Sequence, residues 1–473
     1  MTIVFIASLL FFMIIGLYSS RHKKATTEDY LLAGKNVKPW MVALSAVSTN
    51  NSGYMFIGMI GYTYTYGLSS IWLMFGWIFG DFIGSLFVYK NIRVVIGKEN
   101  MLSFGSVLAH RNKGYIKPIR TVSGIFSLIF LSSYAAAQFM AGGKALTVAF
   151  GWQLWIGIIL GAVLVVSYCF SGGIRASIWT DSAQSMVMII SMGLLTIYAI
   201  DHAGGWDHAI SRLTAVSPGY MKAFPTFKKG LGSWGPFLFV AGWIFAGYGV
   251  VGQPHVMVRY MTLNSPKNIR KVRWFYYTWF TAFYALAIMV GLLSRIVLIR
   301  KAHFDPELAL PTMSLQILPN IMVGIMLSGI FAATISTADS LIISCTAAVT
   351  NDIFPRLKHH YIGNKAVTML VSLLALTFAL WGNKNVFQLV IYAWAVLGTA
   401  FGPLLTLLMI GKKPGMVRSL CMMGGGVLVT LIWNKLGWNT YVYEMLPGMI
   451  AGFLIYFLFS FTDKKTLVGT YAD

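Results

Sequence analysis

The chain is poor in charged residues, and above all in negative charge. Charged residues make up 11% of its 473 residues, and 14 acidic residues stand against 36 basic ones, a formal net charge of +22. Hydrophobic residues make up 57%, and the mean hydropathy is +0.71. Soluble domains carry about 25% charged residues. This composition therefore excludes an ordinary soluble protein and predicts a polytopic membrane protein.

Cysteine and histidine are also scarce. The three cysteines lie within hydrophobic segments and are odd in number, so no disulfide framework is predicted. None of the eight histidines belongs to an HExxH pair, and no GxSxG motif occurs, which disfavours a membrane hydrolase. No cofactor is expected. The loops between hydrophobic segments are short, so no appended soluble domain is expected either.

Hydrophobic runs long enough to cross a bilayer follow one another along the chain. The thirteen predicted transmembrane helices cover residues 2–20, 40–65, 69–90, 121–148, 152–172, 178–200, 234–258, 274–296, 318–350, 365–382, 386–411, 416–434 and 441–461. Basic residues follow the first run, unlike the arrangement in a cleaved signal peptide, so we expect a retained helix. The predicted fold class is an all-α polytopic membrane protein made of one transmembrane domain, residues 1–473.

The basic residues are unevenly divided between the two sides of the predicted membrane. Alternate loops hold 26 Lys and Arg on one side and 10 on the other. The positive-inside rule makes the first side cytoplasmic. The prediction is a multi-pass protein of the cell inner (plasma) membrane with its N-terminus outside and its C-terminus in the cytoplasm. The positive charge is explained by topology, and nucleic acid is not an expected partner.

Two predicted spans contain signals that interrupt a helix. The second span reads ALSAVSTNNSG from Ala43 to Gly53, and its polar residues do not share one helical face. The seventh reads GWIFAGYGVVGQPH from Gly242 to His255, where Pro254 removes an amide donor. Broken helices in corresponding positions are typical of transporters built from inverted repeats. We therefore predict a core of helices 2–6 and 7–11, about residues 40–411, with helix 1 and helices 12–13 (about 416–461) peripheral.

Two intramembrane aspartates are surrounded by hydroxyl side chains. Asp339 lies in TISTADSLIIS with Ser336, Thr337 and Ser340, and Asp181 lies in SIWTDSAQS. Oxygen-only clusters suit a hard cation, and sodium is the natural candidate in a transporter. For a single Ser or Thr, a hydrogen bond to the carbonyl four residues earlier is the simpler explanation. The whole group favours an ion site.

Two further aspartates are expected to be structural. Asp81 lies between Gly80 and Gly84, and we expect it to pair with a base on a neighbouring helix or to make a structural hydrogen bond rather than to contact a substrate. Asp352 follows a predicted helix end and is expected at the membrane interface.

The same segments resemble the sodium:solute symporter family, and within it the sodium/proline symporters. The resemblance runs over nearly the whole chain and includes SGGIRASIWTDSAQ, GQPHVMVRYM, STADSLIISCTAAVTNDIF and YAWAVLGTAFGPLL. It implies thirteen helices with a LeuT-like core and inward transport of a small organic solute coupled to sodium. A proton-coupled member of the family is the alternative, while a channel or a transporter-derived sensor is disfavoured.

The resemblance also assigns site residues. The main sodium site corresponds to the carbonyls of Ser48, Asn51 and Ala333 with the hydroxyls of Ser336 and Thr337. A second ion or coupling site corresponds to Asp181, Asp339 and Ser340 with Ser336. Ser52 and Gly53 match family positions next to ion and substrate.

One residue departs from the family pattern. Proline symporters have an aspartate where this chain has Asn50. The loss of a charge in a partly buried cation site costs several kcal/mol unless it is compensated. We expect Asp339, two residues beyond Thr337, to supply the missing charge.

The expected solute site is less well defined. The candidate residues, besides Asn50, Ser52 and Gly53, are Tyr54, Tyr134, Trp243, Tyr248 and Gln253. In strict register with GQPH, however, the family's tryptophan and tyrosine fall on Ala246 and Val250. An amino acid such as proline is the first expectation, with other amino acids and small carboxylates as alternatives. The sequence does not define the oligomeric state.

Overall fold

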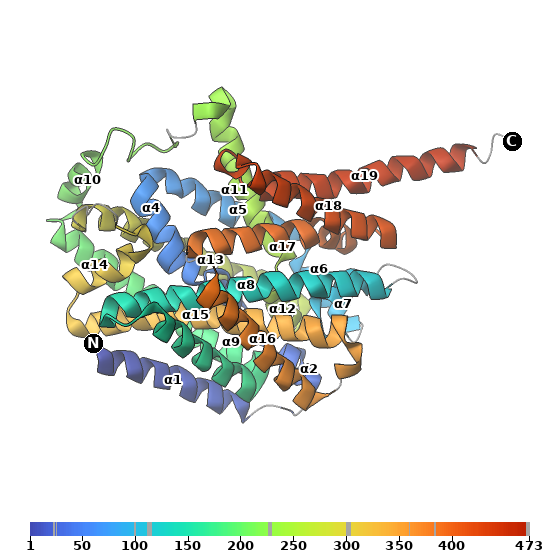
Figure 1. Cartoon of the computed structure of the whole chain (residues 1–473), viewed down its shortest axis with the longest axis horizontal. Helices are drawn as coiled ribbons and strands as arrows, with labels where there is room; N and C mark the ends of the chain where they lie inside the picture. The colour runs from blue at the N-terminus through green and yellow to red at the C-terminus, as the bar shows by residue number, and fades with distance from the viewer. Residues whose placement is uncertain are drawn as a thin grey trace.

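The protein is described by a computed structural model that covers residues 1–21, 24, 26–98, 101–110, 116–225, 229–298, 304–358, 360–382 and 385–469. Helices account for nearly all of these residues (Figure 1). The long helices and the halves of the broken ones are α1 (Thr2–Ser20), α3 (Pro39–Asn50), α4 (Ile60–Tyr66), α5 (Ile71–Phe87), α8 (Ile116–Phe150), α9 (Leu154–His202), α11 (Gly235–Tyr248), α12 (Pro254–Met261), α13 (Ile269–Val297), α15 (Asn320–Ala347), α16 (Tyr361–Trp381), α17 (Val386–Met409), α18 (Met416–Lys435) and α19 (Met445–Gly469). Shorter helices are α2 (Thr27–Leu32), α6 (Tyr89–Lys98), α7 (Phe104–His110), α10 (Trp206–Thr214) and α14 (Ala309–Ile317).

The predicted spans agree with these helices. Within the described residues, ten helical stretches are long and apolar enough to cross a membrane, and two shorter apolar helices cover Leu154–Ser167 and Met445–Phe459. Each of the thirteen predicted ranges overlaps a helix. The predicted spans 152–172 and 178–200 are joined in α9, which departs from helical geometry at Gly173 (φ 58°, ψ −147°). This backbone conformation suits glycine, so the chain passes from one span to the next without a long loop.

Both predicted breaks are present. Helix α3 ends at Asn50, Asn51 and Ser52 leave the helix, and the chain resumes as a π-helical turn, Tyr54–Met59, before α4. Helix α11 passes into a 3₁₀ turn, Gly249–Gly252, and α12 begins at Pro254 after an extended residue, Gln253 (φ −98°, ψ 104°). Proline at the first position of α12 needs no amide donor, which explains why the helix restarts there.

Helix α15 lies in the interior of the bundle. It packs against α9 and α8, and also contacts α3 and α12 near the two breaks. Helix α1 lies along one edge of the molecule on α9 and α15, whereas α18 and α19 lie on the opposite side against α17 (Figure 1). Large hydrophobic residues of α1 and α19, such as Ile3 (84% exposed) and Leu458 (63% exposed), point outward. These exposed apolar surfaces are suited to contact with lipid.

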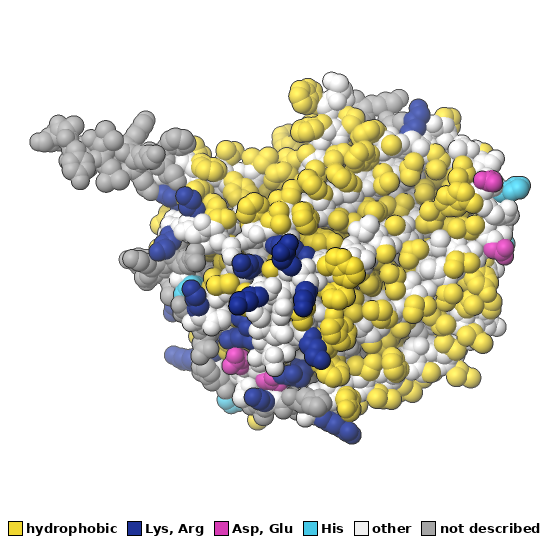
Figure 2. Space-filling view, turned by 180° about the vertical axis from the view of Figure 1, so that it is seen from behind, with side chains coloured by type: hydrophobic (Ala, Val, Ile, Leu, Met, Phe, Trp, Pro, Cys, Tyr) yellow, Lys and Arg dark blue, Asp and Glu magenta, His cyan; other side chains and the backbone are white. Residues whose placement is uncertain are grey.

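The basic residues are concentrated at one end of the bundle. Figure 2 shows hydrophobic side chains over a broad face, with Lys and Arg gathered toward the end from which the C-terminal helix projects. The N-terminus lies toward the other end (Figure 1). The distribution of basic residues in space therefore follows the uneven distribution found along the sequence.

Candidate functional site

The first part of the site is a polar contact between the end of α3 and the middle of α15. The Ser48 hydroxyl donates to the Ser336 hydroxyl at 3.0 Å, and the Thr337 hydroxyl donates to the carbonyl oxygen of Thr49 at 3.0 Å. The Thr49 hydroxyl lies 3.0 Å from that of Ser340. All these side chains are buried. The structure thus brings four predicted ion-site residues, Ser48, Ser336, Thr337 and Ser340, into one seam.

Ala333 and Asn51, also predicted for the sodium site, lie close along the chain to residues of this seam. The Ser336 hydroxyl also lies 3.2 Å from the carbonyl oxygen of Ala333, one turn earlier in α15. Asn51 is the first residue beyond α3, and its side-chain amide donates to the carbonyl oxygen of Val47 at 2.9 Å. These oxygens come from backbone and hydroxyl groups, which are the ligand types that suit a hard cation.

The break in α3 is held by α8. The amide of Gly53 donates to Oε1 of Gln138 at 2.8 Å, and the Tyr134 hydroxyl donates to the Ser52 hydroxyl at 3.2 Å. The Ser52 hydroxyl also accepts from the amide of Tyr54 at 3.1 Å. Backbone groups freed by the break therefore have partners inside the protein, as they must at membrane depth. Sequence reasoning found Tyr134 but missed Gln138, a buried amide one turn further along α8.

A buried charge cluster forms the second part of the site. The guanidinium of Arg259 lies 3.3 Å from Asp181 and 3.7 Å from Asp339, and none of the three side chains is more than 1% exposed. The Ser45 hydroxyl donates to Asp181 at 2.5 Å and the Ser177 hydroxyl to Asp339 at 2.9 Å. With both carboxylates ionised, the cluster carries one net negative charge.

Arg259 is an important residue that the sequence prediction misplaced. The predicted span ends at residue 258, which leaves Arg259 outside it. In the structure it is fully buried within α12 and also donates to the hydroxyls of Ser177 and Ser340. Two intramembrane aspartates require a nearby positive charge. That requirement was the available signal, because Arg259 is the first Lys or Arg after the Pro254 break.

Asn50 belongs to a separate hydrogen-bonded chain that leads to Asp81. The Asn50 side-chain amide donates to the Tyr276 hydroxyl at 2.7 Å, and this hydroxyl donates to Asp81 at 2.6 Å. Asp81 also accepts from the hydroxyls of Tyr277, at 3.1 Å, and Tyr89. The hydrogen bonds expected of Asp81 are present in the structure. Within the described part of the chain its partners are tyrosines and not bases.

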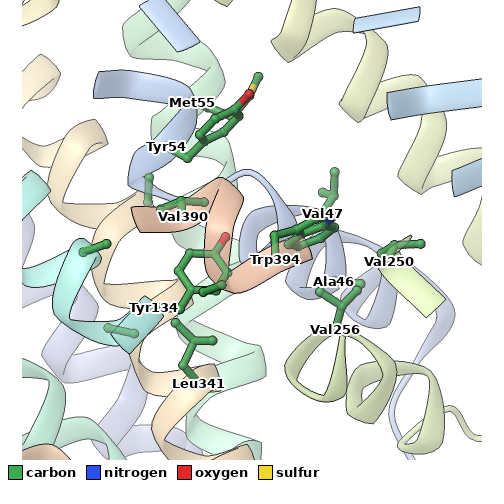
Figure 3. Close-up of a cluster of buried hydrophobic side chains, with 14 of the residues drawn as sticks. Ala46, Val47, Tyr54, Met55, Tyr134, Val250, Val256, Leu341, Val390 and Trp394 are labelled. Carbon is green, nitrogen blue, oxygen red and sulfur yellow. The ribbon is translucent and has the colours of Figure 1, made fainter. Parts of the chain in front are cut away.

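The predicted solute residues fall into two groups. Tyr134, Ser52 and Gly53 meet at the α3 break, and Gln253 donates to the Trp394 carbonyl at 2.9 Å. Figure 3 shows Tyr54, Tyr134 and Val250 in one cluster of buried side chains with Trp394 of α17. Trp394 is another residue that sequence reasoning missed.

Trp243 and Tyr248 make other contacts. The Trp243 ring stacks on Tyr443 at 5.1 Å and on Trp77 at 6.0 Å. The Tyr248 hydroxyl lies 2.7 Å from that of Thr406. By contrast, the Trp394 indole donates to the Ala246 carbonyl at 2.8 Å. Of the two strict-register positions, Ala246 contacts Trp394 directly, and Val250 belongs to the same cluster of buried side chains.

An ion network joins helices at one end of the bundle. Lys144 of α8 lies 2.9 Å from Asp305 and 2.6 Å from Glu307. Glu307 also accepts from the amides of Val386, at 3.2 Å, and Phe387, at 2.8 Å, at the start of α17. The Phe387 ring stacks on Tyr54 with a centroid distance of 5.4 Å, which connects this network to the α3 break.

Asp352, which is expected at the membrane interface, is buried within the protein. It is 2% exposed, accepts from the Ser103 hydroxyl at 2.7 Å and pairs with Arg120 at 3.3 Å. Helix α7 and the start of α8 cover it, so a residue at the end of its own helix is nevertheless buried. Sequence periodicity within one helix could not reveal this cover.

Comparison with known proteins agrees with this geometry. The high-affinity proline transporter PutP of Bacillus subtilis is 28% identical over 95% of this chain and 95% of its own length. The osmoregulated proline transporter OpuE of Bacillus subtilis is 28% identical over 99% and 95%. A sodium/proline symporter of Staphylococcus aureus is 28% identical over 96% and 91%.

Solved structures show the same fold. A Na⁺-coupled sialic acid symporter, solved in a substrate-bound outward-open state, superposes with a TM-score of 0.78 over 97% of both chains at 19% identity. MhsT, solved with L-phenylalanine, superposes with a TM-score of 0.59 over 89% of this chain and 99% of its own at 14% identity. The LeuT-like fold is thereby confirmed. Since the model of the sodium:solute symporter family matches residues 30–425, this integral membrane protein belongs to that family and is a sodium-coupled solute symporter, not an enzyme.

Proposed function

We propose that this symporter imports proline or a closely related small amino acid, with sodium bound at the seam between α3 and α15. The observation that carries the proposal is the direct contact of the broken helix with Ser336 and Thr337. The relatives named as proline transporters support the solute class. Ser48, Asn51 and Ala333 would complete the oxygen ligands of the ion.

The solute would bind where α3 is interrupted. Its carboxylate would be held by backbone amides between Asn50 and Gly53, at the start of the next helical half, where amide dipoles favour an anion. Its apolar part would face Tyr54, Tyr134 and Trp394, with Gln253 positioned by Trp394. Trp243 and Tyr248 would not contact the solute directly. They would support the site through the stacking of Trp243 on Trp77 and the hydrogen bond of Tyr248 with Thr406.

Asp181, Asp339 and Ser340 would couple ion binding to movement of α12, because all three contact Arg259. Their net negative charge supports a second cation or a proton as the alternative coupling species. The structure of the sialic acid symporter reveals a novel Na⁺ site, which supports a second sodium as that cation. Rocking of residues 40–411, as two five-helix repeats, would provide alternating access.

We also propose the plasma membrane as the location, with the C-terminus in the cytoplasm. The gathering of Lys and Arg at the C-terminal end supports this orientation.

The test of solute class is uptake of a labelled amino-acid panel by purified protein in liposomes under an inward sodium gradient. Proline should accumulate, and unlabelled small amino acids should compete in order of their similarity to proline. Accumulation of a small monocarboxylate, without accumulation of any amino acid, would contradict the proposed solute class and favour the carboxylate alternative.

A further inference from the structure

Asn50 is held in one orientation by a residue on another helix. The Tyr276 hydroxyl has one proton and lies between Asp81, at 2.6 Å, and Asn50, at 2.7 Å. Asp81 accepts from three tyrosine hydroxyls, and a carboxylate has no proton to donate in return. Tyr276 therefore donates to Asp81 and must accept from Asn50. The NH₂ group of Asn50, and not its oxygen, faces Tyr276.

The consequence is that the Asn50 side-chain oxygen faces away from Tyr276. Asn50 is 5% exposed, and its Oδ1 has no hydrogen-bond partner among the described residues. A buried oxygen without a partner is costly, so such an atom in a native protein calls for a ligand. It belongs to the last residue of α3, two positions beyond Ser48 in the proposed sodium seam.

The charge of Asp81 is not matched by a base in the described part of the chain. Arg273 of α13 donates to the Ser85 carbonyl, one turn along α5, and Asp81 is paired with hydroxyls alone. Asp339, by contrast, shares its charge with Arg259. The negative charge joined to Asn50 by hydrogen bonds is therefore that of Asp81.

We propose that Asp81 is a positioning residue for sodium binding, acting through Tyr276 to present the Asn50 side-chain oxygen to the ion. This inference rests on the proposed sodium site. A hydrogen-bonded chain that ends on a carboxylate is polarised along its length. Asp81 thus both fixes the orientation of the amide and makes its oxygen a better cation ligand, although the carboxylate does not touch the ion.

The experiment measures binding of radiolabelled sodium to the purified full-length protein without solute. Asp81→Asn and Tyr276→Phe should each raise the apparent Kd for sodium about tenfold, equal to about 1.4 kcal/mol. The matched control is Tyr277→Phe, which removes a donor to Asp81 but leaves the chain to Asn50 intact, and it should change the Kd less than twofold. The double variant Asn50→Asp with Asp81→Asn should recover binding to within about threefold of the parent, because the carboxylate is moved to the ion site.

Two results would overturn the inference while leaving the sodium site standing. One is an Asp81→Asn protein that binds sodium like the parent. The other is an equal loss for Tyr276→Phe and Tyr277→Phe, which would show that Asp81 serves packing alone. If Asp81→Asn does not fold, the sodium Kd values of Tyr276→Phe and Tyr277→Phe still test the inference. Failure of the parent protein to bind sodium would overturn the proposed site and this inference together.

Discussion

Replacement of Arg259 by glutamine removes the positive member of the buried charge cluster. The side chain is fully buried between Asp181 and Asp339, and it also contacts Ser177 and Ser340. With both carboxylates ionised, Arg259→Gln therefore changes the net charge of the cluster from −1 to −2 without removing the bulk of the side chain. We expect a large loss of stability.

The size of the loss follows from the distances. At 3.3 Å from Asp181, Arg259 gains about 5 kcal/mol of Coulomb energy at an effective dielectric constant of about 20. At 3.7 Å from Asp339 the same estimate is about 4.5 kcal/mol. Desolvation opposes both, and removal of one member of a buried ion pair costs about 3–5 kcal/mol in practice. We adopt that lower range.

The assay is thermal stability of the detergent-purified protein, followed by the monodisperse fraction on size exclusion after heating. From most to least thermally stable, we expect the parent, then Arg259→Lys, then the double variant Arg259→Gln with Asp339→Asn, and last Arg259→Gln. The double variant should be more stable than the single one because it restores a net charge of −1. An Arg259→Gln protein as stable as the parent, or a double variant less stable than the single one, would refute the electrostatic reasoning.

Three further predictions concern the seam, the break and the end network. Thr337→Ala removes a buried hydroxyl that contacts Thr49 and should raise the sodium concentration for half-maximal uptake at least tenfold, whereas Thr377→Ala, on exposed α16 surface, should not change it. Gly53→Ala should abolish sodium-driven uptake, because the added Cβ would lie 2.7 Å from Thr334 Cγ2 and 2.9 Å from Ala141 Cβ. Gly193→Ala is the control, because a Cβ there would meet no atom within 4 Å. Normal uptake by Gly53→Ala would contradict tight packing at the α3 break. Glu307→Gln should weaken the contact of α8 with α17 by about 1–3 kcal/mol and increase thiol labelling of a cysteine placed at Phe387 in a cysteine-free background. Unchanged labelling would show that this network does not limit access to position 387.

Much of the fold follows from local features of the sequence. Span-length apolar runs define the helices because a bilayer requires about 20 apolar residues per helix. The two breaks follow from Pro254 and from six polar residues before Gly53, which no single helical face can bury. The ends of the helices are harder to predict. The predicted span ends at residue 258, whereas α12 continues to Met261, so the prediction leaves Arg259 outside the span.

The contacts within the site depend on which helices meet. Ser336 and Thr337 could be predicted as ligands because hydroxyls and an aspartate cluster on one short segment. The partners of Asn50 and Asp81 could not, because Tyr276 is about 200 residues away from both along the chain. Its hydrogen bonds depend on the packing of α13 against α3 and α5, which a single sequence does not specify.

The coupling of the two fluxes can be measured in one experiment. Liposomes containing the protein receive an inward proline gradient with equal sodium concentrations on both sides, and entry of radiolabelled sodium is followed. We expect proline to drive sodium into the liposomes, and Thr337→Ala to reduce this flux. Proline entry without sodium movement, or with acidification of the lumen instead, would contradict sodium symport at the seam between α3 and α15.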